Sequence, residues 1–227
     1  MSGAGPVERT MEVLIFDMDG VVVDSVGHWN TVRERLIEEE LGVDSVDVTK
    51  LVGMNAEDEY AYLAEDNELE QSKETYISLL GEHAKEIYLE RVELLHNVRD
   101  VLDAATENGI TLGVVSASYR RRVELVLDRF DLADYFNTVV AGDDVSGPSK
   151  PDPAIYEHAT ALLEADSGDC VAVEDSEHGV EAATGAGLYC IGYAHHPTQP
   201  LADADETCEN ADALVDRLHE LCRTRSV

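Results

Sequence analysis

A short apolar run near the start of the chain ends abruptly in two aspartates. The run covers 12–16 and is followed by Asp17, Asp19 and Gly20. Such a run is typical of a buried strand in a parallel sheet, and open α/β sheets bind ligands beyond the carboxyl ends of their strands. Two carboxylates there favour a Mg²⁺ site, because Mg²⁺ is commonly held by one or two carboxylates together with substrate phosphate. The alternative is a plain strand-end turn, for which Asp and Gly are ordinary residues.

Further apolar segments predict strands, and helical patterns separate them. The expected strands cover 110–115, 138–141, 170–173 and 188–192, and the expected helices cover 100–107, 120–130, 153–165, 177–186 and 211–222. Asn108-Gly109 is expected to end the first of these helices, and Asp152 to cap the third. The alternation predicts an α/β fold, with a Rossmann-like parallel sheet that has helices on both faces.

The connection between the first two strands is much longer than a crossover requires. It covers 17–109, whereas a crossover needs about a dozen residues. Helical patterns occur in it at 29–41, 56–64 and 77–95. We therefore expect a core domain of 1–25 and 96–227, with a helical domain of 26–95 inserted above the strand ends. Residues 1–10 are expected to be a loose leader, and 195–210 a loop.

The charge balance is strongly acidic. The chain has 48 acidic and 16 basic residues and a formal net charge of −32. Such a surface argues against nucleic acids and anionic membranes as partners, because it lacks the basic patch that phosphate groups require. Self-repulsion of this size is screened at molar salt, so we expect a halophilic protein, with ordinary acidic solubility as the alternative.

The cysteines and the apolar runs indicate the cellular compartment in which the protein is expected. None of the four cysteines forms a CxxC pair, and none has zinc-site spacing with histidines. No apolar run approaches the ~20 residues of a membrane span, and the first ten residues lack the apolar stretch of a signal peptide. A cytoplasmic protein with reduced thiols is expected.

Polar residues also follow the second, third and fourth expected strands. Ser116 follows the second, Lys150 lies in the loop after the third, and Glu174 and Asp175 follow the fourth. All should meet Asp17 and Asp19 at one edge of the sheet, where they would suit a metal ion and a phosphoryl group. Taken singly, each has a structural alternative: Ser116 or Ser118 as a helix cap, Lys150 as a solvated charge, and the acids as turn residues before a helix.

In order and spacing, these motifs resemble the haloacid dehalogenase (HAD) superfamily, in its phosphatase and phosphoglucomutase branch. The resemblance covers nearly the whole chain and rests on DMDGV at 17–21, SAS at 116–118, KPDP at 150–153 and VEDS at 173–176. The inserted helices resemble the cap that closes over the active site in that branch.

The resemblance implies a covalent mechanism. Asp17 would attack phosphorus and form an aspartyl-phosphate, while Asp19 would protonate the leaving oxygen and then deprotonate a water. The expected Mg²⁺ ligands are Asp17, the backbone carbonyl of Asp19, Asp175 and Glu174. The expected phosphate-binding residues are Ser116, Ala117 and Lys150.

The resemblance narrows the function without naming a substrate. Beta-phosphoglucomutases carry a cap arginine where this chain has Ala56 and a histidine where it has Trp29, with His28 as a substitute to consider. We therefore expect a HAD-type phosphoric monoester hydrolase acting on a small phosphorylated metabolite, a sugar phosphate or a phosphoglycolate-like ester. A beta-phosphoglucomutase-like phosphotransferase is the first alternative. A non-catalytic or receiver-like phospho-signalling protein is the second. Dehalogenation is disfavoured because it requires neither Asp19 nor a metal, and the sequence carries no signal for the oligomeric state.

Overall fold

The computed structural model describes residues 10–194 and 201–227. Within them, six strands form one parallel sheet in the order β3-β2-β1-β4-β5-β6. The strands are β1 (Val13–Asp17), β2 (Thr111–Ser116), β3 (Thr138–Ala141), β4 (Cys170–Glu174), β5 (Tyr189–Tyr193) and β6 (Glu206–Cys208). In the middle of the sheet β1 pairs with β2 on one side and β4 on the other. This is the point at which the strand order reverses, and ligands of open α/β sheets bind there.

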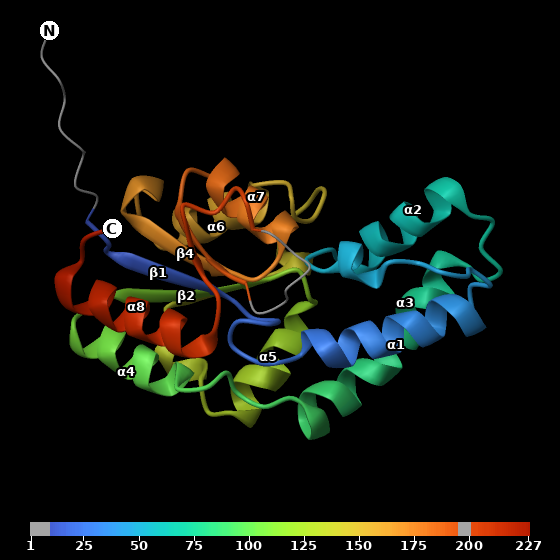
Figure 1. Cartoon of the computed structure of the whole chain (residues 1–227), viewed down its shortest axis with the longest axis horizontal. Helices are drawn as coiled ribbons and strands as arrows, with labels where there is room; N and C mark the ends of the chain where they lie inside the picture. Colours follow the sequence, from blue (N-terminus) through green and yellow to red (C-terminus); the bar gives the residue numbers. More distant parts are fainter. Residues whose placement is uncertain (1–9, 195–200) are drawn as a thin grey trace, which may run out of the picture.

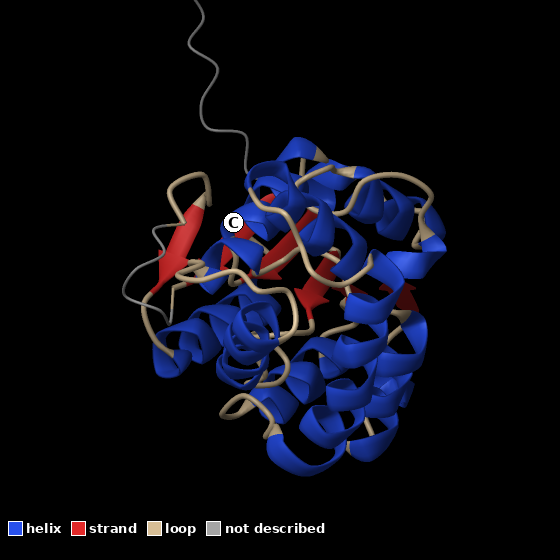
Figure 2. Ribbon diagram, turned by 90° about the vertical axis from the view of Figure 1, so that its right-hand side faces the viewer, coloured by secondary structure: helices blue, strands red, loops and turns tan. Residues whose placement is uncertain are grey.

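Helices cover both faces of the sheet (Figures 1 and 2). One face carries α4 (Val98–Glu107), α5 (Arg120–Arg129) and α8 (Ala211–Thr224), and the other carries α6 (Ala154–Leu162) and α7 (Glu177–Gly185). The side chains of β1 alternate between two apolar clusters: Leu14 and Phe16 join the first, Val13 and Ile15 the second. The predicted fold class is confirmed.

The residues between β1 and β2 form a helical segment beyond the carboxyl ends of the strands (Figure 1, right). It consists of α1 (Val26–Glu39), a 3₁₀ turn (Val48–Leu51), α2 (Ala56–Asp66), α3 (Lys73–Glu86) and a π-helical turn (Ile87–Arg91). Buried side chains of this segment, such as Trp29 and Tyr76, belong to the same apolar cluster as α4 and α5. The helical segment therefore packs directly on the sheet domain, while the domain boundaries at 26 and 95 stay a prediction.

Three local predictions differ from the structure. The helix expected over 77–95 ends at the π-helical turn, because the backbone becomes extended at Val92. The loop expected over 195–210 contains β6, which adds to the edge of the sheet by pairing with β5. Helix α6 covers Ala154–Leu162 instead of 153–165, and its N-cap is Pro153 instead of Asp152. The Asp152 carboxylate still accepts a hydrogen bond from the Ala154 N–H at 3.0 Å.

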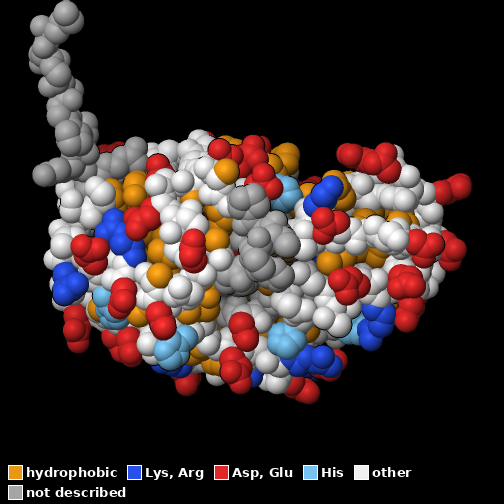
Figure 3. Space-filling model, viewed as in Figure 1, with side chains coloured by type: hydrophobic (Ala, Val, Ile, Leu, Met, Phe, Trp, Pro, Cys, Tyr) orange, Lys and Arg blue, Asp and Glu red, His pale blue; other side chains and the backbone are white. Residues whose placement is uncertain are grey.

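Other predictions hold or lie outside the described residues. Helix α4 ends at Glu107, as expected, and the φ of +67° at Gly109 suits a glycine after a helix. The leader expected over 1–10 and the first half of the loop expected over 195–210 fall mostly on residues outside the described ranges. None of the described helices has both the length and the apolar character needed to span a bilayer. Figure 3 shows acidic side chains scattered over the sheet domain and the helical segment alike.

Candidate active site

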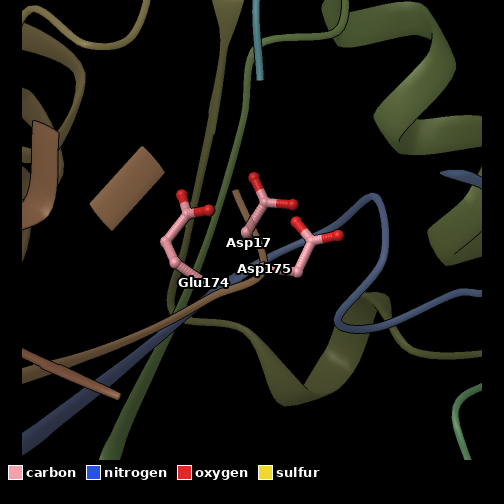
Figure 4. Close-up of side chains that lie close together, drawn as sticks. All are labelled: Asp17, Glu174 and Asp175. Atoms are coloured by element: carbon pink, nitrogen blue, oxygen red, sulfur yellow. The ribbon is translucent and has the colours of Figure 1, made fainter. Parts of the chain in front are cut away.

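Three carboxylates meet at the carboxyl ends of β1 and β4 (Figure 4). Asp17 is the last residue of β1, Glu174 the last of β4, and Asp175 follows Glu174. All three are buried, and one carboxylate oxygen of each lies within 4.8 Å of the other two. A set of oxygen ligands at this spacing fits a hard divalent cation, so the residues present are chemically suited to the expected metal.

Two glycines make room for this acidic cluster. Gly20 has a φ of +92°, and a Cβ on it would lie 2.0 Å from Asp175 Oδ2. A Cβ on Gly179 would lie 1.9 Å from Glu174 Oε2. Both distances are far below any real carbon–oxygen contact, so a side chain at either position would displace a carboxylate of the cluster.

Lys150 lies between two of the acids. Its side chain is buried, and Nζ is 2.5 Å from both Asp17 Oδ1 and Glu174 Oε1. Tyr156 also donates a hydrogen bond to Glu174 Oε1, at 2.5 Å. Lys150 is thus a buried counter-ion, which rules out the alternative of a solvated charge.

The charge state of Asp17 depends on these neighbours. Burial raises the pKa of Asp17 well above its ordinary value, and the charges of Glu174, Asp175 and Asp19 raise it further. Lys150 opposes them by favouring the ionised form. Burial lowers the pKa of Lys150, but the charges of Asp17 and Glu174 more than offset this and hold it above its ordinary value. A cation bound to the acidic cluster would favour ionised Asp17 in the same way as Lys150 does.

Asp19 lies outside the acidic cluster, and hydroxyl groups hold its carboxylate. Ser25 Oγ and Tyr88 Oη donate hydrogen bonds to Oδ1 at 2.6 and 2.8 Å. Ser118 Oγ and Ser116 Oγ donate to Oδ2 at 3.2 and 3.4 Å. Neither serine caps α5, which begins at Arg120 after Tyr119. The side chain of Asp19 is therefore fixed in position and separate from the expected metal ligands.

Tyr88 connects the helical segment to Asp19, and sequence reasoning did not single it out. It belongs to the π-helical turn, and its hydroxyl accepts a hydrogen bond from Trp29 Nε1 at 3.0 Å while donating to Asp19. In the sequence Tyr88 is one of several residues at apolar helical spacing, which predicts only burial. The one sequence feature that could have indicated a further role is its hydroxyl, because a buried tyrosine hydroxyl usually has a hydrogen-bond partner.

A pocket joins the strand ends to the helical segment. Asp17, Asp19 and Asp175 line it, and so do Ser116 and Ala117 at the carboxyl end of β2. The other lining residues are Val26, Trp29, Arg33, Val52, Gly53, Met54, Ser118 and Ser176. Lys150 and Glu174 are not among the described residues that line this pocket; Lys150 contacts both Glu174 and the lining residue Asp17. Residues from the first, second and fourth motifs thus line one cavity, and residues of the helical segment complete its lining.

The loop that carries Lys150 is tied to the helical segment. Asp58 of α2 accepts hydrogen bonds from the Ser149 N–H at 2.9 Å and from Ser149 Oγ at 2.6 Å. Ser149 Oγ in turn accepts one from the Asn55 N–H at 3.3 Å. We call these three contacts the Ser149 link.

Comparison with known proteins identifies the family. A family model described as haloacid dehalogenase-like hydrolase matches residues 14–193. The chain belongs to this family. It is 32% identical to a phosphorylated carbohydrates phosphatase of Thermotoga maritima over 82% of the chain and 86% of that protein. It is 26% identical to the beta-phosphoglucomutase of Bacillus subtilis over 92% of the chain and 95% of that protein.

A solved structure supports the same HAD fold. CbbY from Rhodobacter sphaeroides, crystallised with phosphate, superposes with a TM-score of 0.74 at 23% identity, over 93% of this chain and 96% of CbbY. The family match and the phosphatase relative confirm the predicted enzyme class, a HAD-type phosphoric monoester hydrolase.

Proposed function

We propose that this HAD hydrolase is a Mg²⁺-dependent phosphatase that cleaves small phosphate monoesters through an aspartyl-phosphate on Asp17. The observation that carries the proposal is the position of Asp17. It lies within a buried set of Glu174, Asp175 and Lys150 and lines a pocket that it shares with Asp19. A carboxylate nucleophile, a separate acid–base group and a cation-binding cluster are the parts that two-step phosphoryl transfer requires.

In the first step a carboxylate oxygen of Asp17 bonds to phosphorus, and the ester P–O bond breaks. Asp19 gives its proton to the leaving oxygen. In the second step Asp19 takes a proton from a water, whose oxygen bonds to phosphorus while the bond from phosphorus to Asp17 breaks. Inorganic phosphate is released. The support for this division of roles is that Asp19 is held apart from the acidic cluster by four hydroxyl donors.

The remaining residues would offset phosphoryl charge. In a loose transition state, positioning and electrostatics supply most of the catalysis. Ser116, Ala117 and Lys150 would bind phosphoryl oxygens. Asp17, Glu174, Asp175 and the Asp19 carbonyl would hold Mg²⁺, which when bound neutralises negative charge between Asp17 and the phosphate. In the same proposal the helical segment acts as a cap over the active site.

The proposed location is the cytoplasm. The four cysteines are buried free thiols, which is consistent with a reducing compartment.

Release of inorganic phosphate tests the proposal. We expect turnover of a panel of phosphorylated metabolites with Mg²⁺ in molar KCl, loss of turnover in EDTA, and recovery when Mg²⁺ is added back. Asp17→Asn should be folded and inactive, whereas Asp44→Asn, at an exposed aspartate, should match the wild type. Turnover by Asp17→Asn at the wild-type rate would refute the covalent mechanism.

A phosphomutase is the second candidate, and one observation favours it. Although position 56 is alanine, two arginines, Arg33 and Arg122, line the pocket that Ala56 also lines. The site therefore has positive charge near a second phosphate even though residue 56 is not arginine. A coupled assay decides between the two: a phosphatase releases phosphate from β-glucose 1-phosphate, and a mutase accumulates glucose 6-phosphate.

A further inference from the structure

Arg122 is a buried cation that the proposed mechanism does not use. It lies on α5 and is 8% exposed, and within the described residues its Nε and Nη2 have no hydrogen-bond partner. The guanidinium carbon is 5.1 Å from the centre of the Tyr119 ring and 5.7 Å from that of the Trp29 ring. Stacking on aromatic rings accounts for the faces of the guanidinium but leaves its edge donors unpaired. A buried donor without a partner is costly.

The space next to Arg122 continues the catalytic pocket. A second pocket is lined by Arg122, Tyr119, Asn55, Ala56, Glu59 and Leu80, together with five residues of the catalytic pocket: Trp29, Arg33, Met54, Ala117 and Ser118. The two pockets therefore adjoin along five shared side chains. A molecule whose phosphate lies at Asp17 would therefore have its other end next to the pocket that Arg122 lines.

Arg122 has no acidic partner among the described residues that line the second pocket. Arg33 forms an ion pair with Glu59 at 2.5 Å, and Glu59 also accepts a hydrogen bond from Tyr76 at 3.1 Å. The charges of Arg33 and Glu59 thus cancel, and Glu59 is the only acid among the described lining residues. Of the charged residues that line the second pocket, Arg122 is thus the one without an ion pair to another described lining residue, in a chain of net charge −32.

We propose that Arg122 binds a second anionic group, a carboxylate or a phosphate, at the end of the substrate away from the scissile ester. The proposal rests on the proposed function and adds the substrate class: phosphate esters with an anionic far end. A guanidinium offers parallel N–H donors that match both anions, and Arg122 lines the second pocket.

Matched pairs of substrates test the proposal. 3-Phosphoglycerate and glycerol 3-phosphate differ by a carboxylate, and glucose 1,6-bisphosphate and glucose 6-phosphate differ by a phosphate. The measured quantity is the kcat/KM ratio of the anionic to the neutral member of each pair, in wild type, Arg122→Met, Arg122→Lys and Arg121→Met. Arg121 is the matched control, since it is the exposed neighbour on the same helix and lines neither pocket.

We expect the wild type to favour the anionic member of at least one pair, and that pair identifies the anion. Because a hydrogen bond to a charged group contributes about 1.5–3 kcal/mol, Arg122→Met should lower the ratio about 10- to 100-fold. Arg122→Lys should lower it less, and Arg121→Met should leave it unchanged. A ratio near one in the wild type, or an equal fall in Arg121→Met, overturns the proposal.

A binding measurement separates this proposal from the proposed function. The Kd values of the same four esters are measured by calorimetry on Asp17→Asn, with and without Arg122→Met, in the presence of Mg²⁺. If wild-type protein turns over none of the esters, the phosphatase assignment fails. The Kd preference for the anionic member, and its loss with Arg122→Met, still decides the role of Arg122.

Discussion

Replacing Lys150 by methionine should strongly destabilise the metal-free protein. Methionine keeps the unbranched stem of lysine but removes the ammonium group, which lies 2.5 Å from Asp17 and from Glu174. Two buried carboxylates would then face each other with no positive charge between them. Removing one partner of a buried ion pair costs about 3–5 kcal/mol. For a protein of this size, that corresponds to a fall in melting temperature of about 6–20 °C.

The measurement is urea unfolding in EDTA, with Lys73→Met as control. Lys73 is exposed at the start of α3, where a positive charge opposes the helix dipole, so its loss should change the unfolding free energy by about 0.5 kcal/mol or less. Mg²⁺ should raise the stability of Lys150→Met more than that of the wild type, because it restores positive charge to the same carboxylates. An unfolding free energy for Lys150→Met within about 1 kcal/mol of wild type would refute the assignment of Lys150 as the counter-ion.

Four further outcomes are expected. Asp19→Asn should lower kcat by about 10²- to 10⁴-fold in the phosphate-release assay, and an unchanged kcat would exclude it as the acid–base group. Tyr88→Phe should lower the unfolding free energy by about 1–3 kcal/mol in urea titrations, because Trp29 and Asp19 each lose a hydrogen-bond partner; an unchanged value would mean that the hydroxyl is dispensable. In EDTA at pH 7, Asp17→Asn should be more stable than wild type, because burial raises the Asp17 pKa and the ionised form destabilises the fold. The difference in unfolding free energy between Asp17→Asn and wild type should shrink as pH falls through that raised pKa toward about 3.9. A difference that grows as pH falls would contradict a raised pKa for Asp17. The melting temperature should rise with KCl as the net charge of −32 is screened, and a flat curve from 0.1 to 2 M would remove the halophilic hypothesis.

The sheet and its polar strand ends could be predicted because both follow from local pattern. Continuous apolar runs locate β1, β2 and β4, and parallel topology then brings Asp17, Ser116 and Glu174 to one edge of the sheet. Strand β6 was missed because three residues, Glu206–Cys208, are too short for a pattern and form a strand only by pairing with β5.

The partners of individual side chains could not be predicted, because they depend on how distant helices pack. Tyr88 and Arg122 lie on helical stretches whose periodicity indicates which residues are buried but not what they meet. The hydroxyl of Tyr88 reaches Asp19, 69 residues away in sequence. That Arg122 has no ion pair with Glu59 follows from the structure, in which Glu59 pairs with Arg33. Sequence reasoning thus located the reacting groups, and the structure shows what surrounds them.

The Ser149 link has a consequence for any motion of the helical segment. Ser149 holds Asp58 of α2, and the next residue, Lys150, holds Asp17. Rotating α2 away from the sheet would therefore pull on the residue adjacent to the lysine that contacts Asp17 and favours its ionised form. If the helical segment moves to admit substrate, the Ser149–Lys150 peptide bond links that motion to the lysine that contacts Asp17. We therefore expect substitutions in α2 that break the Asp58–Ser149 hydrogen bonds to change the reactivity of Asp17 as well.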